Sequence, residues 1–175
     1  MFSKSLRAFL RYSFFLLILL LSSCQIFSGR KGQPAEVKDS SIDQRINPPN
    51  QEKSVIETVP LMNDAVKSLF ALAQQNFEQN HFQKALSQLQ RAYRIQPNAP
   101  EVTQLMAEIN LHQGDAQHAY YWATISTQNS PAKGKICEKS WRILALAADI
   151  LSDEASQAMA LENKERCVVK APNRF

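Results

Sequence analysis

The sequence predicts an all-α protein made of short antiparallel helix pairs. Glycine is scarce, with 4 residues among 175, whereas the good helix formers Ala, Leu and Gln are abundant. From residue 64 onward, apolar residues recur at spacings of three and four, which place them on one face of a helix. The sequence contains neither GxGxxG nor GxxxxGK followed by Ser or Thr, so the two commonest phosphate-binding loops are excluded.

The first 23 residues have the layout of a secretory signal peptide. A basic stretch from Lys4 to Arg11 precedes an uninterrupted apolar run over residues 14–21. That run is too short to cross the ~30 Å hydrocarbon core of a bilayer, so residues 1–23 are expected to be a signal peptide and not a spanning helix. Directly after the run, the sequence Leu-Ser-Ser-Cys ending at Cys24 resembles the lipobox of bacterial lipoproteins.

The lipobox resemblance implies lipidation of Cys24. In that family a diacylglycerol alkylates the cysteine thiol, and acyl chains such as palmitate anchor the mature protein, each buried CH₂ contributing about 0.8 kcal/mol. Gln25, and not Asp, follows the cysteine, which implies sorting to the periplasmic face of the outer membrane. The alternative is an ordinary cleaved signal peptide with a chance cysteine.

Residues 24–62, the lipidated cysteine and the segment after it, are expected to form a flexible linker. Four of the eight prolines lie in this segment, and Phe27 is its only aromatic residue. Such a composition buries too little apolar surface to offset the entropy lost on ordering. The linker would hold the following domain roughly 35 Å from the membrane. The alternative is that its end folds back on the domain through Val55, Ile56 and Val59.

The net charge of +4 does not indicate a nucleic-acid partner. Of the 20 basic residues, Lys4, Arg7 and Arg11 lie in the signal peptide, and the remaining 17 are balanced by 16 acidic residues. Binding to nucleic acid needs a basic surface that displaces counterions. We therefore expect no nucleic acid among the partners.

A block of 34 residues occurs twice from residue 64 onward. Spacing of apolar and small residues defines two helices in the first block, with a break at Asn80-His81 and an end at Pro97. Matching residues stand 34 positions apart at Ala73 and Ala107, Asn76 and Asn110, Ala85 and Ala119, and Pro97 and Pro131. A helix–turn–helix of this length, with small residues where the helices cross, resembles the tetratricopeptide repeat (TPR).

A third helix pair completes the expected domain. The run from Trp141 to Ala148 repeats the first-helix spacing, and a polar last helix follows the break and N-cap at Ser152-Asp153. We therefore expect a short TPR-like solenoid of about three antiparallel helix pairs over residues 63–168, and a C-terminal tail over 169–175. An unrelated helical bundle is the alternative.

In the TPR family the first helices line the concave side of the solenoid, so the resemblance implies a partner-binding groove. Its expected residues are Phe70, Gln74 and Phe77 in the first repeat and Gln104, Glu108 and Leu111 in the second. Apolar side chains beside Gln and Glu suit an amphipathic helix or an extended segment of an envelope protein. The alternative is that Phe70 and Phe77 pack beneath the last residues of the linker.

Trp122 and Ile125 form a second candidate patch for a partner. They lie three positions apart on a helix, away from its alanine stripe. Because Trp is enriched at interaction hot spots, an exposed pair would anchor a partner. The alternative is that both residues pack on the third helix pair.

The titratable residues form no recognisable catalytic or metal-binding motif. His81, His112 and His118 match neither HExxH nor a His-x₃-His pair, and are expected to be solvated near the helix turns. No local pattern combines a nucleophile, a base and an orienting acid. We therefore expect no enzyme, no cofactor and no metal site; catalysis on an envelope substrate is the alternative.

Cys137 and Cys167 are expected to form a disulfide. With Cys24 lipidated, they are the remaining cysteine pair in an oxidising compartment. Their midpoint is residue 152, at the break of the third hairpin, and residues equidistant from the turn of an antiparallel pair lie side by side. Two free thiols are the alternative, if an offset of the helices moves the Cα atoms beyond about 7 Å.

Together these features predict an outer-membrane lipoprotein whose periplasmic TPR-like domain is a scaffold for envelope proteins in envelope, pilus or secretion assembly. The layout resembles pilotin and pilus-assembly lipoproteins. It is also similar to adaptors that recruit cell-wall hydrolases and to subunits of outer-membrane assembly machines. A purely structural envelope protein without a specific partner is a further alternative.

Overall fold

The computed structural model describes residues 38–49 and 61–169, which lie within one compact unit, Glu36–Phe175. These residues form seven helices and no strand, which confirms the all-α class. None of the described helices is long and apolar enough to span a membrane. The helices are α2 (Ser40–Ile46), α3 (Asp64–Glu78), α4 (Phe82–Ile95), α5 (Pro100–His112), α6 (Ala116–Asn129), α7 (Lys135–Ile150) and α8 (Glu154–Arg166).

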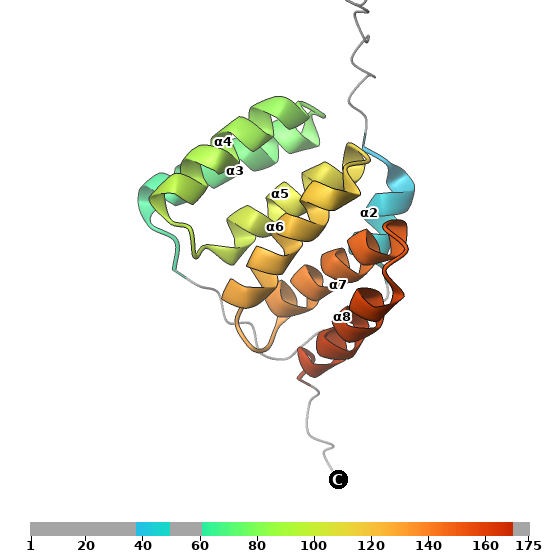
Figure 1. The fold of residues 1–175 in the computed structure, drawn as a ribbon. Helices are drawn as coiled ribbons and strands as arrows, with labels where there is room; N and C mark the ends of the chain where they lie inside the picture. The colour runs from blue at the N-terminus through green and yellow to red at the C-terminus, as the bar shows by residue number, and fades with distance from the viewer. Residues whose placement is uncertain (1–37, 50–60, 170–175) are drawn as a thin grey trace, which may run out of the picture. The chain divides into compact units, whose positions relative to one another are not determined.

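The six longer helices form three antiparallel pairs in chain order. α3 pairs with α4, α5 with α6, and α7 with α8, and the pairs lie side by side (Figure 1). α5 lies in the middle and contacts α3, α4, α6 and α7. One core cluster fills the space between the first and second pairs and another that between the second and third, and the half-buried Trp122 packs against both.

Each helix pair turns on one residue in the left-handed conformation. These residues are Asn80 (φ 60°), Gly114 (φ 75°) and Ser152 (φ 58°). In each turn a backbone N–H bonds back to a carbonyl five residues earlier, from His81 to Asn76, Asp115 to Asn110 and Asp153 to Ala148, over 2.8–2.9 Å. The first two turns therefore repeat the 34-residue period seen in the sequence.

Side-chain caps fix where three of these helices begin. Asn63 accepts from the N–H of Val66 at the start of α3, and Asp153 accepts from Ser156 at the start of α8. At the start of α6, the N–H of His118 bonds the carboxylate of Asp115 and lowers the pKa of that carboxyl. The expected break and N-cap at Ser152-Asp153 is therefore present.

α5 is buried on nearly every side. All its residues from Val102 to His112 are buried, including the polar Thr103, Gln104 and Asn110. A helix enclosed all round shows no clear apolar stripe, because no face is reserved for water.

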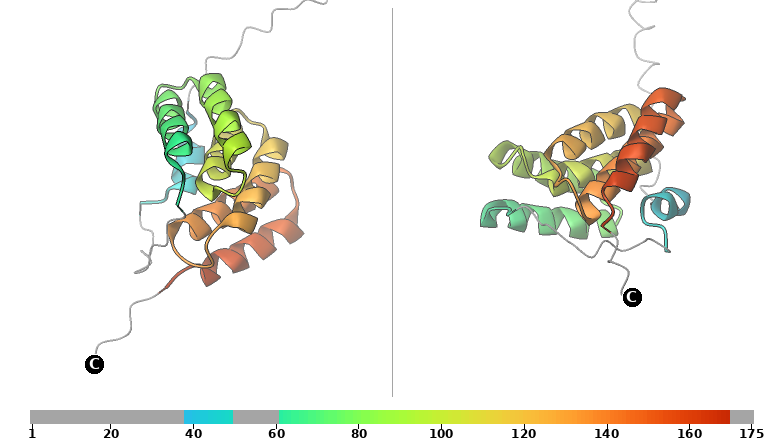
Figure 2. Two further views of the ribbon diagram at one scale, coloured as in Figure 1. Left: turned by 90° about the vertical axis from the view of Figure 1, so that its left-hand side faces the viewer. Right: turned by 90° about the horizontal axis from the view of Figure 1, so that it is seen from below.

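The expectation of a flexible linker over residues 24–62 is wrong for residues 38–49. α2 forms there and packs against α5 and α7 on the side of the first helices (Figure 2). Asp39 caps the helix, and Ile42 and Ile46, four residues apart, are 9% and 0% exposed. The expected fold-back through Val55, Ile56 and Val59 lies outside the described residues, as do the signal peptide, Cys24 and the tail after residue 169.

Candidate partner-binding groove

A pocket of about 370 Å³ opens between α2, α3, α5 and α7, on the side where the sequence placed the groove. We call it the groove pocket. Its lining residues are Lys38, Asp43, Asn47, Phe70, Gln74, Phe77, Glu78, Glu101, Gln104, Leu105, Glu108 and Lys139. Five of the six expected groove residues are among them, and Leu111 is not.

The two phenylalanines of the first repeat have different roles. Phe70 is half-buried at the pocket wall, whereas Phe77 is only 5% exposed and belongs to the core. The Phe77 ring lies 5.7 Å from that of Phe82 and 5.4 Å from that of His112. The ammonium of Lys38 sits 4.0 Å above the same ring. The expected linker therefore does pack against Phe77, as in the alternative interpretation. The residue that does so is Lys38, and not one of the last residues of that segment.

Gln104 and Leu111 serve the fold more than the groove. The amide of Gln104 donates to Ser140 Oγ over 2.8 Å and to the carbonyl of Ile136 over 3.0 Å, which ties α5 to α7. Leu111 is buried in the same core cluster as Ile42 and Ile46 of α2. Neither side chain is free to bind a partner while these contacts hold.

The groove pocket is acidic, and one of its carboxylates is unpaired. The Glu108 carboxylate lies 2.8 Å from the ammonium of Lys139. Both carboxylate oxygens of Glu101 are buried and have no hydrogen-bond partner, and burial raises the pKa of this side chain. Four acidic residues (Asp43, Glu78, Glu101, Glu108) line the pocket against two lysines (Lys38, Lys139). The site therefore favours a ligand that brings a positive charge.

His112 is buried, which corrects the expectation of a solvated histidine. It is 9% exposed, and its Nδ1 accepts a 2.9 Å hydrogen bond from the backbone N–H of Asp39. Its Nε2 is buried without a hydrogen-bond partner. Burial is the main cause that lowers the pKa of His112, against the opposing effect of the nearby carboxylates, Glu108 first.

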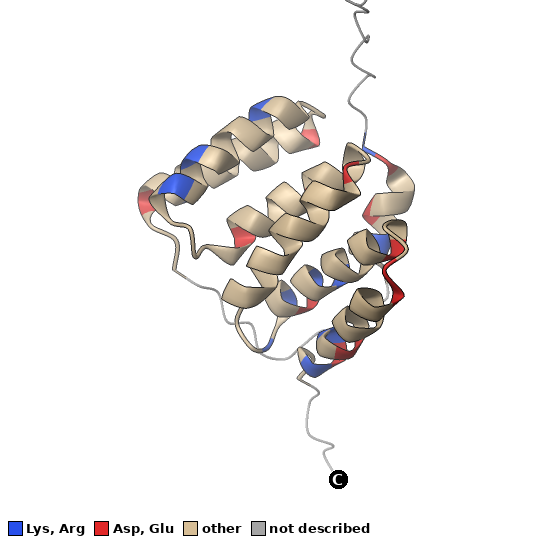
Figure 3. Cartoon of the chain, in the orientation of Figure 1, with Lys and Arg blue, Asp and Glu red and all other residues tan. Residues whose placement is uncertain are grey.

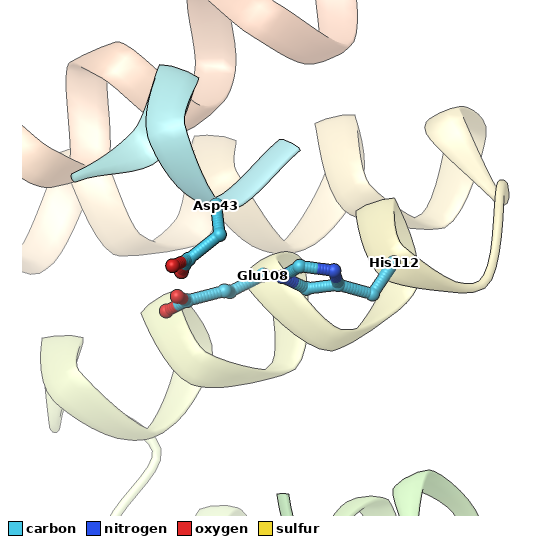
Figure 4. A group of neighbouring side chains, drawn as sticks. All are labelled: Asp43, Glu108 and His112. Carbon is cyan, nitrogen blue, oxygen red and sulfur yellow. The ribbon is translucent and has the colours of Figure 1, made fainter. Parts of the chain in front are cut away.

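His112 forms a cluster with two carboxylates. Ligand atoms of Asp43, Glu108 and His112 lie within 4.8 Å of one another, and Figure 4 shows the imidazole ring pointing toward the two acids. Because the Asp39 N–H can only donate, Nδ1 must accept, so the neutral ring carries its proton on Nε2. A metal ion would need the lone pair of that nitrogen. In this tautomer Nε2 carries a hydrogen and offers no lone pair, and it has no hydrogen-bond partner.

Trp122 and Ile125, the second candidate patch, are half-buried on α6. The Trp122 ring stands edge-on to Tyr93 at 5.2 Å and to Tyr121 at 4.8 Å, so it packs toward the first pair as well as the third. Tyr121 is 55% exposed beside it. α6 carries no Lys, Arg, Asp or Glu (Figure 3), so this aromatic surface has no charged residue of its own helix.

Cys137 and Cys167 are joined at the open end of the third helix pair. Their Cα atoms lie 5.7 Å apart across a separation of 30 residues. Cys137 is in the first turn of α7 and Cys167 caps the end of α8. The N–H of Gly134 also donates to the carbonyl of Cys167 over 3.0 Å, so two links close this end of the domain.

Several pocket residues could not be identified from the sequence. Lys38, Asp43 and Asn47 belong to the segment expected to be a linker, and Lys139 becomes a neighbour of the groove only when α5 and α7 pack together. The one available signal was the spacing of Ile42 and Ile46 behind Asp39, which suits a capped amphipathic turn.

The sequence matches no protein-family model and no curated protein. Among solved structures, the chain is similar to the globular C-terminal domain of LpoP from P. aeruginosa, with 27% identity and a TM-score of 0.54. The match covers 60% of this chain and 99% of that domain. This likeness agrees with the helical solenoid and supports a bacterial lipoprotein of TPR-like kind; it does not single out a pilotin.

Proposed function

We propose that the protein is an outer-membrane lipoprotein that binds a periplasmic segment of another envelope protein in the groove pocket. The observation that carries the proposal is the pocket itself, whose lining includes Phe70, Gln74 and Glu108. The likeness to the LpoP domain supports an envelope setting. Lipidation of Cys24 would hold the domain at the membrane.

The chemistry of the pocket specifies the bound segment. Phe70 offers a partly exposed apolar wall, and Gln74 offers an exposed amide next to it. The buried and unpaired carboxylate of Glu101 is costly unless a cation pairs with it. The segment we propose is therefore amphipathic, with an apolar side chain against Phe70 and a Lys or Arg that reaches Glu101.

The proposed role is that of an adaptor, without a catalytic step of its own. Gln104 is engaged by Ser140 and Glu108 by Lys139, so two of the polar groups in the pocket have structural partners. Among envelope partners we favour enzymes of the cell wall, in keeping with the adaptor alternative of the sequence analysis and with the likeness to the LpoP domain. A pilus- or secretion-assembly protein is the second candidate. It is supported by the order of lipobox and repeats, which resembles that of pilotin and pilus-assembly lipoproteins.

Capture of partners tests the proposal. The full chain, tagged and acyl-anchored, is compared with a Phe70→Ala/Gln74→Ala variant and with a control variant, Gln83→Ala/Gln90→Ala, whose residues are exposed on α4. We expect an envelope protein that wild type and control enrich and that the groove variant loses, with unchanged helical content in all three. Equal recovery by all three chains would refute the groove, and the identity of the captured protein separates cell-wall enzymes from assembly proteins.

A further inference from the structure

α2 crosses the domain on the face where the groove opens, and side chains and backbone hold it along its length. At its start, the Lys38 N–H donates to Asn80 Oδ1 over 3.0 Å, and the Asp39 N–H donates to His112 over 2.9 Å. At its end, Arg142 donates to the carbonyl of Ile46 over 2.9 Å, and Arg45 pairs with Asp149. The segment therefore binds across α3, α5 and α7 as a peptide ligand would.

The docking of α2 buries few apolar side chains. Only Ile42 and Ile46 are buried, and the other residues of the helix are exposed. A helix of seven residues is unstable by itself in water, so it forms only while it is docked. Two apolar anchors and the polar contacts at either end oppose the entropy of ordering the whole segment, so the released form is a minor but accessible state.

We propose that α2 is an intramolecular ligand of the groove, which a helix of the partner displaces. The proposal rests on the proposed function and adds the regulation of its site. Asp43 and Asn47 of α2 form part of the pocket wall, so a partner helix that enters the pocket meets α2 directly. The partner's apparent affinity therefore equals its affinity for the open groove multiplied by the fraction of molecules in which α2 is released.

The contacts of α2 define what the displacing helix carries in addition to the apolar residue for Phe70 and the basic residue for Glu101. That helix carries two aliphatic residues four positions apart, which replace Ile42 and Ile46 in the cluster with Leu111. It carries a basic residue near its C-terminal end for Asp149, as Arg45 does now. Its last carbonyls accept from Arg142. The partner therefore presents a short amphipathic helix that resembles α2 itself.

Release of α2 also lengthens the tether. With α2 docked, the chain between a lipidated Cys24 and Lys38 spans at most about 50 Å. With α2 released, the limit is set by the length of chain between Cys24 and Leu61, which spans at most about 130 Å. Partner binding at the groove would thus be coupled to the distance that the domain can reach from the membrane.

The test uses a fluorescent synthetic peptide of residues 38–49 as the probe, added to the full chain. The target variant is Ile42→Asp/Ile46→Asp, whose own α2 cannot dock, and the control is Ser41→Ala/Gln44→Ala, two exposed positions of the same helix. We expect the target variant to bind the peptide at least tenfold more tightly than wild type or control. A peptide with both isoleucines changed to Asp should not bind. Equal binding to all three chains, or binding to none, would overturn the proposal.

A second measurement does not depend on the folding of the variant. Wild-type full chain labelled with ¹⁵N is mixed with excess unlabelled peptide, and amide hydrogen exchange is followed in α2 and in α7. We expect the exchange of the α2 amides to accelerate at least tenfold with no change in α7; unchanged exchange in α2 would contradict displacement. Because neither measurement needs the partner, a failure of partner capture leaves these results intact and refutes the proposed function alone.

Discussion

The backbone N–H of Asp39 donates a 2.9 Å hydrogen bond to Nδ1 of His112, which lies 73 residues further along the chain. This bond attaches the N-cap of α2 to the last residue of α5. It also fixes the neutral ring with its proton on Nε2, the nitrogen aimed at Asp43 and Glu108. The docking of α2 is therefore linked to the protonation state of one buried imidazole.

We predict that α2 docking weakens as the pH falls below about 6.5. Burial lowers the pKa of His112 from its ordinary value of 6.5, so the released form takes up the proton more readily than the docked form. A protonated Nδ1 can no longer accept from Asp39. The contribution of His112 to α2 docking is thus complete above pH 6.5. It is lost as the pH falls toward the lowered pKa that His112 has in the docked form. The charged groups around the ring act in both directions. Glu108, Asp43 and Asp39 raise the pKa of His112 and so reduce the effect of acid on docking, whereas Lys38 lowers that pKa and increases the effect.

The measurement is the protection factor of the Asp39 amide between pH 7.5 and 5. We expect it to fall in wild type and to be independent of pH in His112→Gln. His118→Gln is the control, because His118 is exposed and pairs with Asp115 on α6. A protection factor in wild type that stays constant over this range would show that His112 does not control docking.

Phe77→Ala should unfold the domain more easily, whereas Phe70→Ala should not. Phe77 is 5% exposed and packs on Phe82, so its truncation leaves a cavity and costs about 3–5 kcal/mol of unfolding free energy. Phe70 is half-buried at the pocket, and its truncation should cost about 1 kcal/mol. Denaturant unfolding of the two single variants decides this. Similar losses at both positions would place Phe70 in the core and remove it from the groove.

Gln104→Ala should destabilise the domain by about 1–3 kcal/mol, because one buried and one partly buried hydrogen bond between α5 and α7 are lost. Its acceptors are the hydroxyl of Ser140 and the carbonyl of Ile136. Gln74→Ala is the matched control, since Gln74 is exposed, and should change stability by no more than about 0.5 kcal/mol. Equal stability of the two variants would contradict a structural role for Gln104 and would favour its role as a groove residue.

Loss of the Cys137–Cys167 bond should cost roughly 3–4 kcal/mol of stability. The bond closes a loop across 30 residues, and the estimate follows from the entropy that this closure removes from the unfolded chain. The comparison is between wild type and Cys137→Ser/Cys167→Ser in denaturant unfolding. Mass spectrometry of alkylated protein from the periplasm provides the second check. Two alkylatable thiols in folded wild type would contradict the bond.

Cys24→Ser should prevent acylation and leave an unprocessed precursor. The expectation follows from the lipobox, in which the thiol of the cysteine is the acyl acceptor. Membrane fractionation and the mass of the mature N-terminus measure the result. Serine-containing protein that is processed and fractionates like wild type would refute the lipoprotein assignment.

The sequence by itself determined the features that depend on local spacing. The turns at Asn80 and Ser152 follow from breaks in the apolar period, and both residues adopt the left-handed conformation there. The meeting of Cys137 and Cys167 follows from equal distances to the second of these turns. Such features need only the geometry of one hairpin, which a linear pattern contains.

Only the tertiary structure decided the roles of His112, Phe77 and the segment around α2. A helix as short as Ser40–Ile46 has too weak a local signal, because its stability comes from packing of Ile42 and Ile46 on residues far along the chain. Lys38 and Asp39 of that distant segment contact Phe77 and His112, and both of these side chains are buried. The sequence thus determined which residues face the first-helix side of the repeats. The packing of the chain's own linker decided which of those residues remain open to a partner.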